Sequence, residues 1–267
     1  MLDASCNRLH NSSMKLVSDV LRDLLFICCI VLAGVLWASA YKHYKTSARA
    51  SALKDRISDY GGMIVPIRIS KDQDKFFTIG TGELIMLPSK QTAILTNSHV
   101  CEAALATSLW VSTVVHDRPV YDLKVMKNSL IPDLCLYYSP SVLYMRSFLV
   151  KDIAPTYGEL LLEIGFPLNG RQRPTTGFYL GENKESKIGM PLLDSNGCTH
   201  GEVDPEGYCV LTEDLEATTV ETYPGNSGSP VFNEQGAMIG IMNSADGETH
   251  DGQFVSGKHI LEFIKGL

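Results

Sequence analysis

The chain has 267 residues, of which 45% are hydrophobic and 20% are charged. These values are typical of a globular protein with a sizeable core, and the length allows one large domain or two small ones. The formal net charge is −7, and the lysine and arginine residues are scattered along the chain. A general nucleic-acid-binding surface needs clustered positive charge, so no polynucleotide partner is expected.

The first predicted element is an apolar helix near the N-terminus. After a tail over residues 1–23, residues 24–41 read LLFICCIVLAGVLWASAY and contain no charged side chain. About 18 such residues are near the lower limit for spanning a bilayer. A core helix would show polar residues at helical spacing, which this stretch lacks. We therefore expect residues 24–41 to bring the protein to a membrane.

The sequence leaves open whether this segment is kept and which way it faces. The tripeptide ASA at residues 38–40 fits a signal-peptidase site, especially if translation starts at Met14, and an uncleaved anchor fits equally well. Lysine and arginine are more frequent after the segment than before it, which by the positive-inside rule would hold the following domain in the cytoplasm. We predict a membrane-anchored protein with an extracytoplasmic domain; the alternatives are secretion after cleavage near Ala40 and a cytoplasmic domain.

The remaining chain predicts a short linker and a β-rich domain. Residues 42–57, KHYKTSARASALKDRI, are polar and rich in alanine and predict a helical stalk. Residues 58–267 contain short apolar runs rich in Val, Ile, Tyr, Phe and Thr, separated by Gly, Pro, Asn or Asp, which is the pattern of an all-β protein. The final GKHILEFIKGL has the clearest helical pattern of this domain, with Ile260, Phe263 and Ile264 on one face. A barrel or a pair of barrels is expected.

One turn in this domain carries a candidate nucleophile. The sequence ETYPGNSGSPVF at residues 221–232 places Ser227 among glycines and prolines. A surface turn is the ordinary interpretation. The alternative is a nucleophile whose neighbouring backbone N–H groups bind an oxyanion. Such a serine needs a base, and the base needs an orienting carboxylate.

Two other segments offer the base and the carboxylate. His99 lies in AILTNSHVCEAA, at a predicted junction between a strand and a short helix that would expose the imidazole on a rigid backbone. Asp133, in LIPDLCLYY, leads directly into an apolar strand, where an unpaired charge would be costly. The other histidines of the domain lie in polar contexts and are expected at the surface.

The boxes TNSHV, PDLCL and PGNSGSPVF, in this order, resemble the His, Asp and Ser boxes of trypsin/chymotrypsin-like serine proteases. The HtrA-type and glutamyl-endopeptidase-like bacterial branches are the most similar. Flanking segments such as GTGELIML and NEQGAMIGIMNS extend the resemblance over residues 63–267. The resemblance implies two six-stranded antiparallel β-barrels with a short C-terminal helix. It also implies hydrolysis of peptide bonds through an acyl-enzyme intermediate, with a peptide or protein substrate and no metal or cofactor.

The resemblance also implies a role for individual residues. Ser227 would be the nucleophile, His99 the general base and then acid, and Asp133 the group that fixes the imidazole tautomer. The backbone N–H groups of Gly225 and Ser227 would form the oxyanion hole, with Asn226 shaping the turn. Three residues are implied as substrate contacts: Glu221, Asn243 and Ser244.

Two departures from the family pattern limit what can be predicted about specificity. Only about 40 residues follow Ser227, too few for the PDZ domain that HtrA-type proteases carry after the protease. Met242 stands where glutamyl endopeptidases usually have a histidine. Glu221 falls where the trypsin family places the floor of its specificity pocket, and an acid there would favour Lys or Arg. The substrate, the cleavage specificity and the oligomeric state are not predicted.

Two alternatives use the same serine. An α/β-hydrolase presents its serine in G-x-S-x-G, but position 229 is serine, and the strand-rich pattern lacks the alternating helices of that fold. A protease fold that only binds peptides or protein partners would typically lack a triad member, and none is missing. The predicted function is therefore a serine endopeptidase, with the catalytically silent binding module as the alternative.

Four of the seven cysteines lie in the β-rich domain. Cys198 and Cys209 flank a polar, turn-rich stretch, so a hairpin-closing disulfide is predicted if the compartment is oxidising. No second pair at zinc-type spacing accompanies them, and no metal site is predicted. Cys101 and Cys135 could form a second bridge or remain buried thiols, and the sequence does not choose between these.

Overall fold

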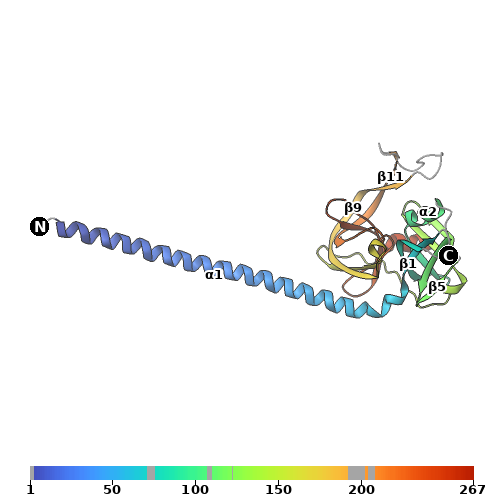
Figure 1. Cartoon of the computed structure of the whole chain (residues 1–267), viewed down its shortest axis with the longest axis horizontal. Coiled ribbons are helices and arrows are strands. Elements are labelled where there is room, and N and C mark those ends of the chain that lie inside the picture. The colour runs from blue at the N-terminus through green and yellow to red at the C-terminus, as the bar shows by residue number, and fades with distance from the viewer. Residues whose placement is uncertain (1–2, 71–75, 107–109, 122, 192–201, 204–207) are drawn as a thin grey trace. The chain divides into compact units, whose positions relative to one another are not determined.

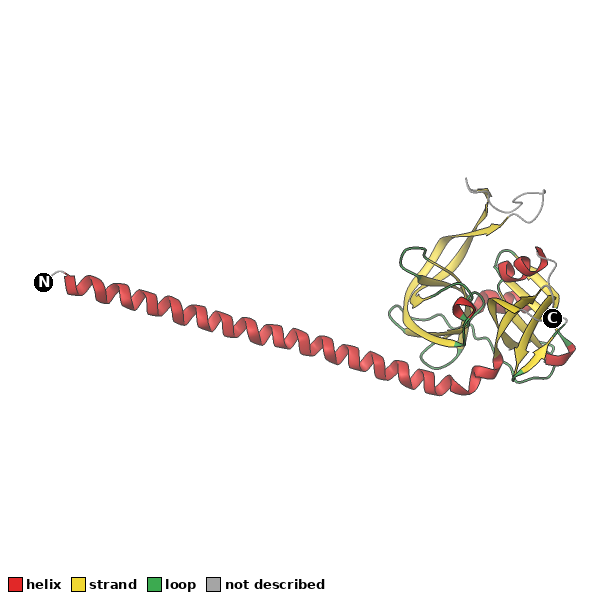
Figure 2. Cartoon of the chain, in the orientation of Figure 1, coloured by secondary structure: helices red, strands yellow, loops and turns green. Residues whose placement is uncertain are grey.

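The fold is described by a computed structural model that covers the chain except residues 1–2, 71–75, 107–109, 122, 192–201 and 204–207. The chain divides into two units, residues 1–49 and residues 50–267. The described residues of the first unit are part of the long helix α1 (Asp3–Ile57), and the second unit contains all the described strands (Figures 1 and 2).

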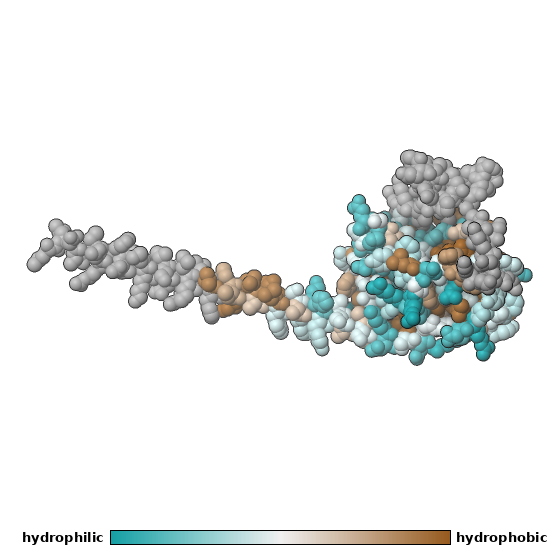
Figure 3. Space-filling model, in the orientation of Figure 1, coloured by the Kyte–Doolittle hydropathy of each residue, from teal (hydrophilic) through white to brown (hydrophobic). Residues whose placement is uncertain are grey.

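Helix α1 includes the predicted apolar segment. The described side chains from Leu25 to Tyr41 are all exposed, and Figure 3 shows them as a hydrophobic band on the helix. By length and composition, the described helical stretch Ile27–Met63 could include a membrane span. Exposed apolar surface of this extent is unusual for a protein in water. The prediction of an N-terminal hydrophobic helix is confirmed.

The end of α1 belongs to the second unit. Leu53 and Ile57 are buried in its core, and Arg56 Nη1 donates a hydrogen bond of 2.9 Å to the backbone oxygen of Glu234. The 3-10 helix η1 (Ser58–Met63) then leads into the first strand. Part of the predicted stalk therefore packs with the β-rich domain. The predicted domain boundaries at residues 23, 41 and 57 stay predictions.

The first sheet has seven antiparallel strands in the order β5-β4-β1-β2-β3-β7-β6. Their bounds are β1 (Ile64–Ser70), β2 (Phe76–Met86), β3 (Thr92–Thr96), β4 (Trp110–Val115), β5 (Arg118–Val120), β6 (Lys124–Ser129) and β7 (Leu134–Tyr138). Helix α2 (Ser98–Ala106) directly follows β3. Along the chain, the 3-10 helix η2 (Pro140–Val142) directly follows β7. The 3-10 helix η3 (Pro167–Asn169) comes later, between the first two strands of the second sheet. This sheet curls, and no described pairing joins its two edge strands.

The second sheet closes into a barrel. Its order is β10-β11-β14-β13-β12-β8-β9, and β9 also pairs with β11, so that six strands form a ring and β10 stands outside it. Their bounds are β8 (Leu160–Gly165), β9 (Arg173–Pro191), β10 (Glu202–Val203), β11 (Tyr208–Glu221), β12 (Pro230–Phe232), β13 (Met238–Ala245) and β14 (Asp251–Ser256). The mostly β fold with a C-terminal helix is confirmed.

The last helix, α3 (Gly257–Ile264), buries the face that its sequence predicts. Ile260, Phe263 and Ile264 are at most 7% exposed. Burying each such side chain contributes about 1.5–3 kcal/mol. The amphipathic spacing alone therefore explains why this segment docks as a helix.

One hydrophobic core joins the two sheets. It includes Leu84 and Leu134 from the first sheet and Leu160 and Leu215 from the second. A shared core fixes the two sheets against each other, because protein interiors are close-packed. This matters for the predicted site, which takes residues from both sheets.

Candidate active site

The structure brings His99 and Asp133 together. Strand β3 ends at Thr96 and α2 begins at Ser98, so His99 lies in the first turn of α2. Its backbone N–H donates to Asp133 Oδ1 at 2.9 Å, and its Nδ1 lies 2.6 Å from Asp133 Oδ2. One carboxylate thus fixes both the backbone and the ring of His99.

The surroundings of this pair set the charge of the imidazole. The side chain of Asp133 is only 1% exposed, and that of His99 is 26% exposed. Burial lowers the pKa of His99, but the charge of Asp133, its hydrogen bond and the charge of Glu213 raise the pKa, which ends above the ordinary value of 6.5. The neutral imidazole that a general base requires is therefore the main form only above this raised pKa.

A disulfide ties the same two elements. Cys101 of α2 and Cys135 of β7 are bonded, with their Cα atoms 6.4 Å apart, and both are fully buried. Each cysteine follows its site residue, His99 or Asp133, by two positions. The sequence left open whether these two cysteines form a disulfide or remain buried thiols, and the structure has the disulfide. Cys198 and the side chain of Cys209 lie outside the described residues, so their disulfide stays a prediction.

Two glycines shape the loop of Ser227, between β11 and β12. Gly225 has φ +98° and Gly228 has φ +83°, in the left-handed region that favours glycine. A Cβ on Gly225 would lie 2.4 Å from the Phe166 oxygen, and one on Gly228 would lie 2.1 Å from the Thr81 oxygen. No other residue type fits either position without moving the backbone.

Thr81 of β2 fixes this loop to the first sheet. Its N–H donates to the Ser227 oxygen at 2.8 Å, and its Oγ1 donates to the Gly225 oxygen at 2.7 Å. Between them, the Asn226 N–H donates to the Tyr223 oxygen at 2.9 Å. Across the described part of the chain, the N–H groups of Gly225 and Ser227 donate no hydrogen bond. Two unused N–H groups at these positions are what an oxyanion hole requires.

The Ser227 loop and the first turn of α2, where His99 lies, both approach Gly80 of β2. A Cβ on Gly80 would be 2.8 Å from both Val100 methyl groups and 3.2 Å from the Ser227 oxygen. Ser227 Oγ donates to the Asn243 oxygen at 3.3 Å, and among the described residues no hydrogen bond joins Oγ to His99. Hydrogen bonds between catalytic groups are often long without substrate and tighten in the complex.

Comparison with known proteins assigns the family. The sequence profile of the trypsin-like peptidase domain matches residues 80–241, more than half of the chain. This chain belongs to the trypsin-like peptidase family. The resemblance found in the sequence is thereby confirmed, and the family supports a serine protease function. No curated protein sequence matches the chain.

Solved structures with the same fold include bacterial proteases. The active form of the Rv3671c protease from M. tuberculosis has a TM-score of 0.59 and 17% identity, covering 78% of this chain and 82% of that chain. The MamO protease domain from Magnetospirillum magneticum has a TM-score of 0.56 and 16% identity, covering 76% and 96%. The HtrA-type protease AlgW with a tripeptide has a TM-score of 0.54 and 17% identity, covering 79% and 61%. At such identities the likeness shows the fold alone.

The expected substrate contacts of this trypsin-like peptidase lie on strands next to the Ser227 loop. Glu221, at the end of β11, is exposed, and Tyr223 Oη donates to its carboxylate at 3.4 Å. Asn243 of β13 is buried, and its neighbour Ser244 is half-buried. Substrate contact by these three residues stays a prediction.

Sequence analysis missed three buried carboxyl groups in the described part of the peptidase: Glu83 of β2, Glu163 and Glu213. Glu163 of β8 is fully buried and accepts a hydrogen bond of 3.1 Å from Thr222 Oγ1; burial raises the pKa of Glu163 to about 8. Glu163 is the one charged residue of the run LLLEIGF, a signal that could have found it. Glu213 of β11 contacts both Asp133 and Asn243. Its local sequence, TEDLE, is ordinary for a surface and gives no such signal.

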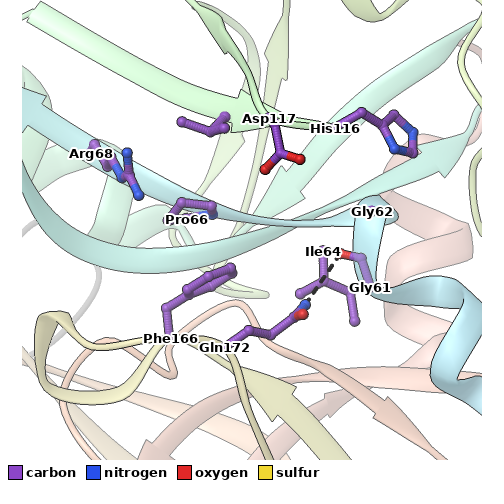
Figure 4. Close-up of a pocket in the computed structure, with 10 residues that line it drawn as sticks. Gly61, Gly62, Ile64, Pro66, Arg68, His116, Asp117, Phe166 and Gln172 are labelled. Carbon is purple, nitrogen blue, oxygen red and sulfur yellow. Dashed lines mark hydrogen bonds between the residues drawn. The ribbon is translucent and has the colours of Figure 1, made fainter.

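A pocket of about 390 Å³ includes Phe166 in its lining, and the backbone oxygen of Phe166 lies close to Gly225 of the Ser227 loop (Figure 4). Its lining includes Arg68, His116, Asp117 and Phe166, and Gln172 Nε2 donates to the Gly61 oxygen at 3.3 Å. None of the predicted site residues lines it. Within the described residues, no group of three His, Cys, Asp or Glu side chains could hold a metal ion.

Proposed function

We propose that this peptidase is a serine endopeptidase that uses Ser227, His99 and Asp133 as a catalytic triad. The observation that carries the proposal is the double contact of Asp133 with His99, beside a loop that offers two unused backbone N–H groups. Family membership supports a peptidase, and these contacts supply the chemistry that such a peptidase needs.

The geometry supports the following sequence of steps. The contact of Nδ1 with Asp133 Oδ2 keeps the proton of a neutral His99 on Nδ1, which leaves the Nε2 lone pair free. Ser227 Oγ turns from the Asn243 oxygen, gives its proton to Nε2 and attacks the peptide carbonyl. The N–H groups of Gly225 and Ser227 bind the resulting oxyanion. The intermediate collapses to an acyl-enzyme as His99 protonates the leaving amine, and a water molecule then releases the acid by the same route.

Labelling with a fluorophosphonate probe tests the nucleophile and its activation together. The purified wild-type protein should be labelled, and Ser227→Ala should not. Ser229→Ala is the matched control, because Ser229 lies in the same loop but is fully buried; this variant should remain labelled. A folded wild-type protein that resists labelling would instead favour a module that only binds peptides or proteins.

We further propose that residues 24–41 anchor the protein in a membrane and that the peptidase domain faces an oxidising compartment. The exposed apolar side chains of α1 support the anchor. The Cys101–Cys135 disulfide supports the compartment, since structural disulfides are rare in the cytosol. The lysine and arginine excess after the segment would favour the cytoplasmic side, so the thiol state decides between the two orientations.

Thiol mapping on native membranes tests this assignment. The full chain should resist a carbonate wash of the membranes, and a variant without residues 24–41 should be released. After unfolding in detergent, Cys101 and Cys135 should react with maleimide only when a reductant is added. Free thiols at both positions would place the domain in the cytoplasm. Cys101→Ala/Cys135→Ala should lose up to about 4 kcal/mol of unfolding free energy, because the bridge closes a loop of 34 residues.

A further inference from the structure

A continuous set of hydrogen bonds passes through Glu213 and links the two sheets. On one side, the Asp133 N–H donates to Glu213 Oε1 at 3.1 Å, and Asp133 in turn holds His99. On the other side, Asn243 Nδ2 donates to Glu213 Oε2 at 3.5 Å, and the backbone oxygen of Asn243 accepts from Ser227 Oγ. Glu213 thus links the His99–Asp133 pair to β13, the strand whose Asn243 backbone oxygen accepts from Ser227 Oγ.

The position of Glu213 is unfavourable for a carboxyl group. The residue is only 4% exposed, in a strand whose neighbours Thr212 and Asp214 are exposed. Burial, and then the charges of Asp133 and Asp214, raise the pKa of Glu213 to about 8. A buried carboxyl group costs stability unless its hydrogen bonds are made. These bonds are the ones to Asp133 and Asn243.

Either protonation state of Glu213 can link Asp133 to Asn243, and we call this link the Glu213 bridge. The ionised form accepts from Asn243 Nδ2, as described. Within the described part of the chain, Asn243 Oδ1 has no hydrogen-bond partner. Rotating that amide by half a turn would put Oδ1 against Glu213 Oε2, so that a protonated carboxyl could donate to it. A glutamine at position 213 can make the same two contacts as the protonated acid, whereas an alanine can make neither.

We propose that Glu213 is a positioning residue that holds the His99–Asp133 pair of the first sheet in register with Ser227 of the second. This inference rests on the proposed function, since it assigns the bridge a role only if the three residues act together. Small displacements of reacting groups can cost about 10²-fold in rate, and the bridge restrains the relative placement of base and nucleophile.

The test measures fluorophosphonate labelling at saturating probe, because this needs no identified substrate. Glu213→Ala should lower the limiting labelling rate by about 10²-fold with little change in the half-saturating concentration. Glu213→Gln should restore the rate to within a few-fold of wild type at pH 6.5. Asp214→Asn, at the exposed neighbouring carboxylate, is the matched control and should be labelled at the wild-type rate at pH 6.5, although the loss of its charge should lower the pKa of Glu213.

Asn243 provides an independent arm. Asn243→Ala keeps the backbone oxygen that binds Ser227 but removes the side chain that meets Glu213. It should slow labelling about as much as Glu213→Ala does. The double variant should be little slower than either single variant, because both changes break one bridge.

The pH profile separates positioning from a purely structural role. The titratable groups that face Glu213 are Asp133, His99 and Asp214. Ionised Glu213 favours the imidazolium form of His99, which develops in the transition state. The ratio of the wild-type labelling rate to that of Glu213→Gln should therefore increase as the pH rises through about 8.

Each outcome bears on one claim. Unlabelled wild-type protein would reject the proposed triad itself. A labelled wild-type protein with an equally fast Glu213→Ala, or with Glu213→Gln as slow as Glu213→Ala, would reject the bridge and leave the triad standing. If Glu213→Ala does not fold, Glu213→Gln decides: a ratio of wild-type to variant rates that stays constant from pH 6.5 to 9 would overturn the proposal.

Discussion

Ser227→Ala and His99→Ala are each expected to lower the hydrolysis of unfolded casein by about 10⁶-fold in turnover number. The reason is that, in the proposed mechanism, the serine and the imidazole act in the same step. Without the base, Ser227 Oγ keeps its proton and is a weak nucleophile, and without the serine the base has no proton to take. The small residual rate would come from substrate binding and from the Gly225 and Ser227 backbone N–H groups.

The double variant gives the sharper result. Ser227→Ala/His99→Ala should be hardly slower than either single variant, because members of one catalytic unit are not additive. His116→Asn is a suitable control: His116 lies in a turn at φ +47°, which asparagine tolerates, and lines the pocket of Figure 4, which none of the predicted site residues lines. It should keep the wild-type rate. Multiplicative losses in the double variant would mean that Ser227 and His99 act independently.

The parts of the molecule that local sequence determines could be predicted. The turn at Ser227 was predicted from glycines that its backbone geometry requires, and the buried face of α3 was predicted from its own periodicity. The strands were found because apolar and turn residues alternate along the chain. These local patterns can be interpreted without knowing which other parts of the chain the segment contacts.

The parts that depend on contacts between distant residues could not be predicted. Glu213 and Asp133 are separated by 80 positions, and only the folded sheets bring them together. The sequence likewise left the pairing of Cys101 with Cys135 open, because spacing does not show whether a helix and a distant strand meet. The end of α1 looked like a polar stalk, although Leu53 and Ile57 are apolar at helical spacing and are buried in the core.

Asp133→Asn tests the third member of the proposed triad, and the contacts of Asp133 determine the expected outcome. Asp133 Oδ1 accepts from the His99 backbone N–H, and Oδ2 faces Nδ1 of the ring. Asparagine has one oxygen, which must stay with the backbone donor. Its NH₂ group then points at Nδ1 and can donate only if Nδ1 carries no proton. The ring proton moves to Nε2, which can no longer accept the proton of Ser227.

We therefore expect Asp133→Asn to fold and to lose about 10⁴-fold in turnover near neutral pH, the cost of holding the wrong tautomer. The pH profile should change as well. The charge and hydrogen bond of Asp133 raise the pKa of His99, while burial lowers it. Without the charge, the imidazole loses its proton at lower pH, so the acid limb of the profile should move to lower pH. Glu102→Gln is the control, because Glu102 is a carboxylate of α2, the helix of His99, but contacts Asn128 instead. It should change neither the turnover number nor the acid limb. Retention of more than a tenth of the wild-type turnover, or an acid limb at the wild-type pH, would show that Asp133 does not set the state of His99.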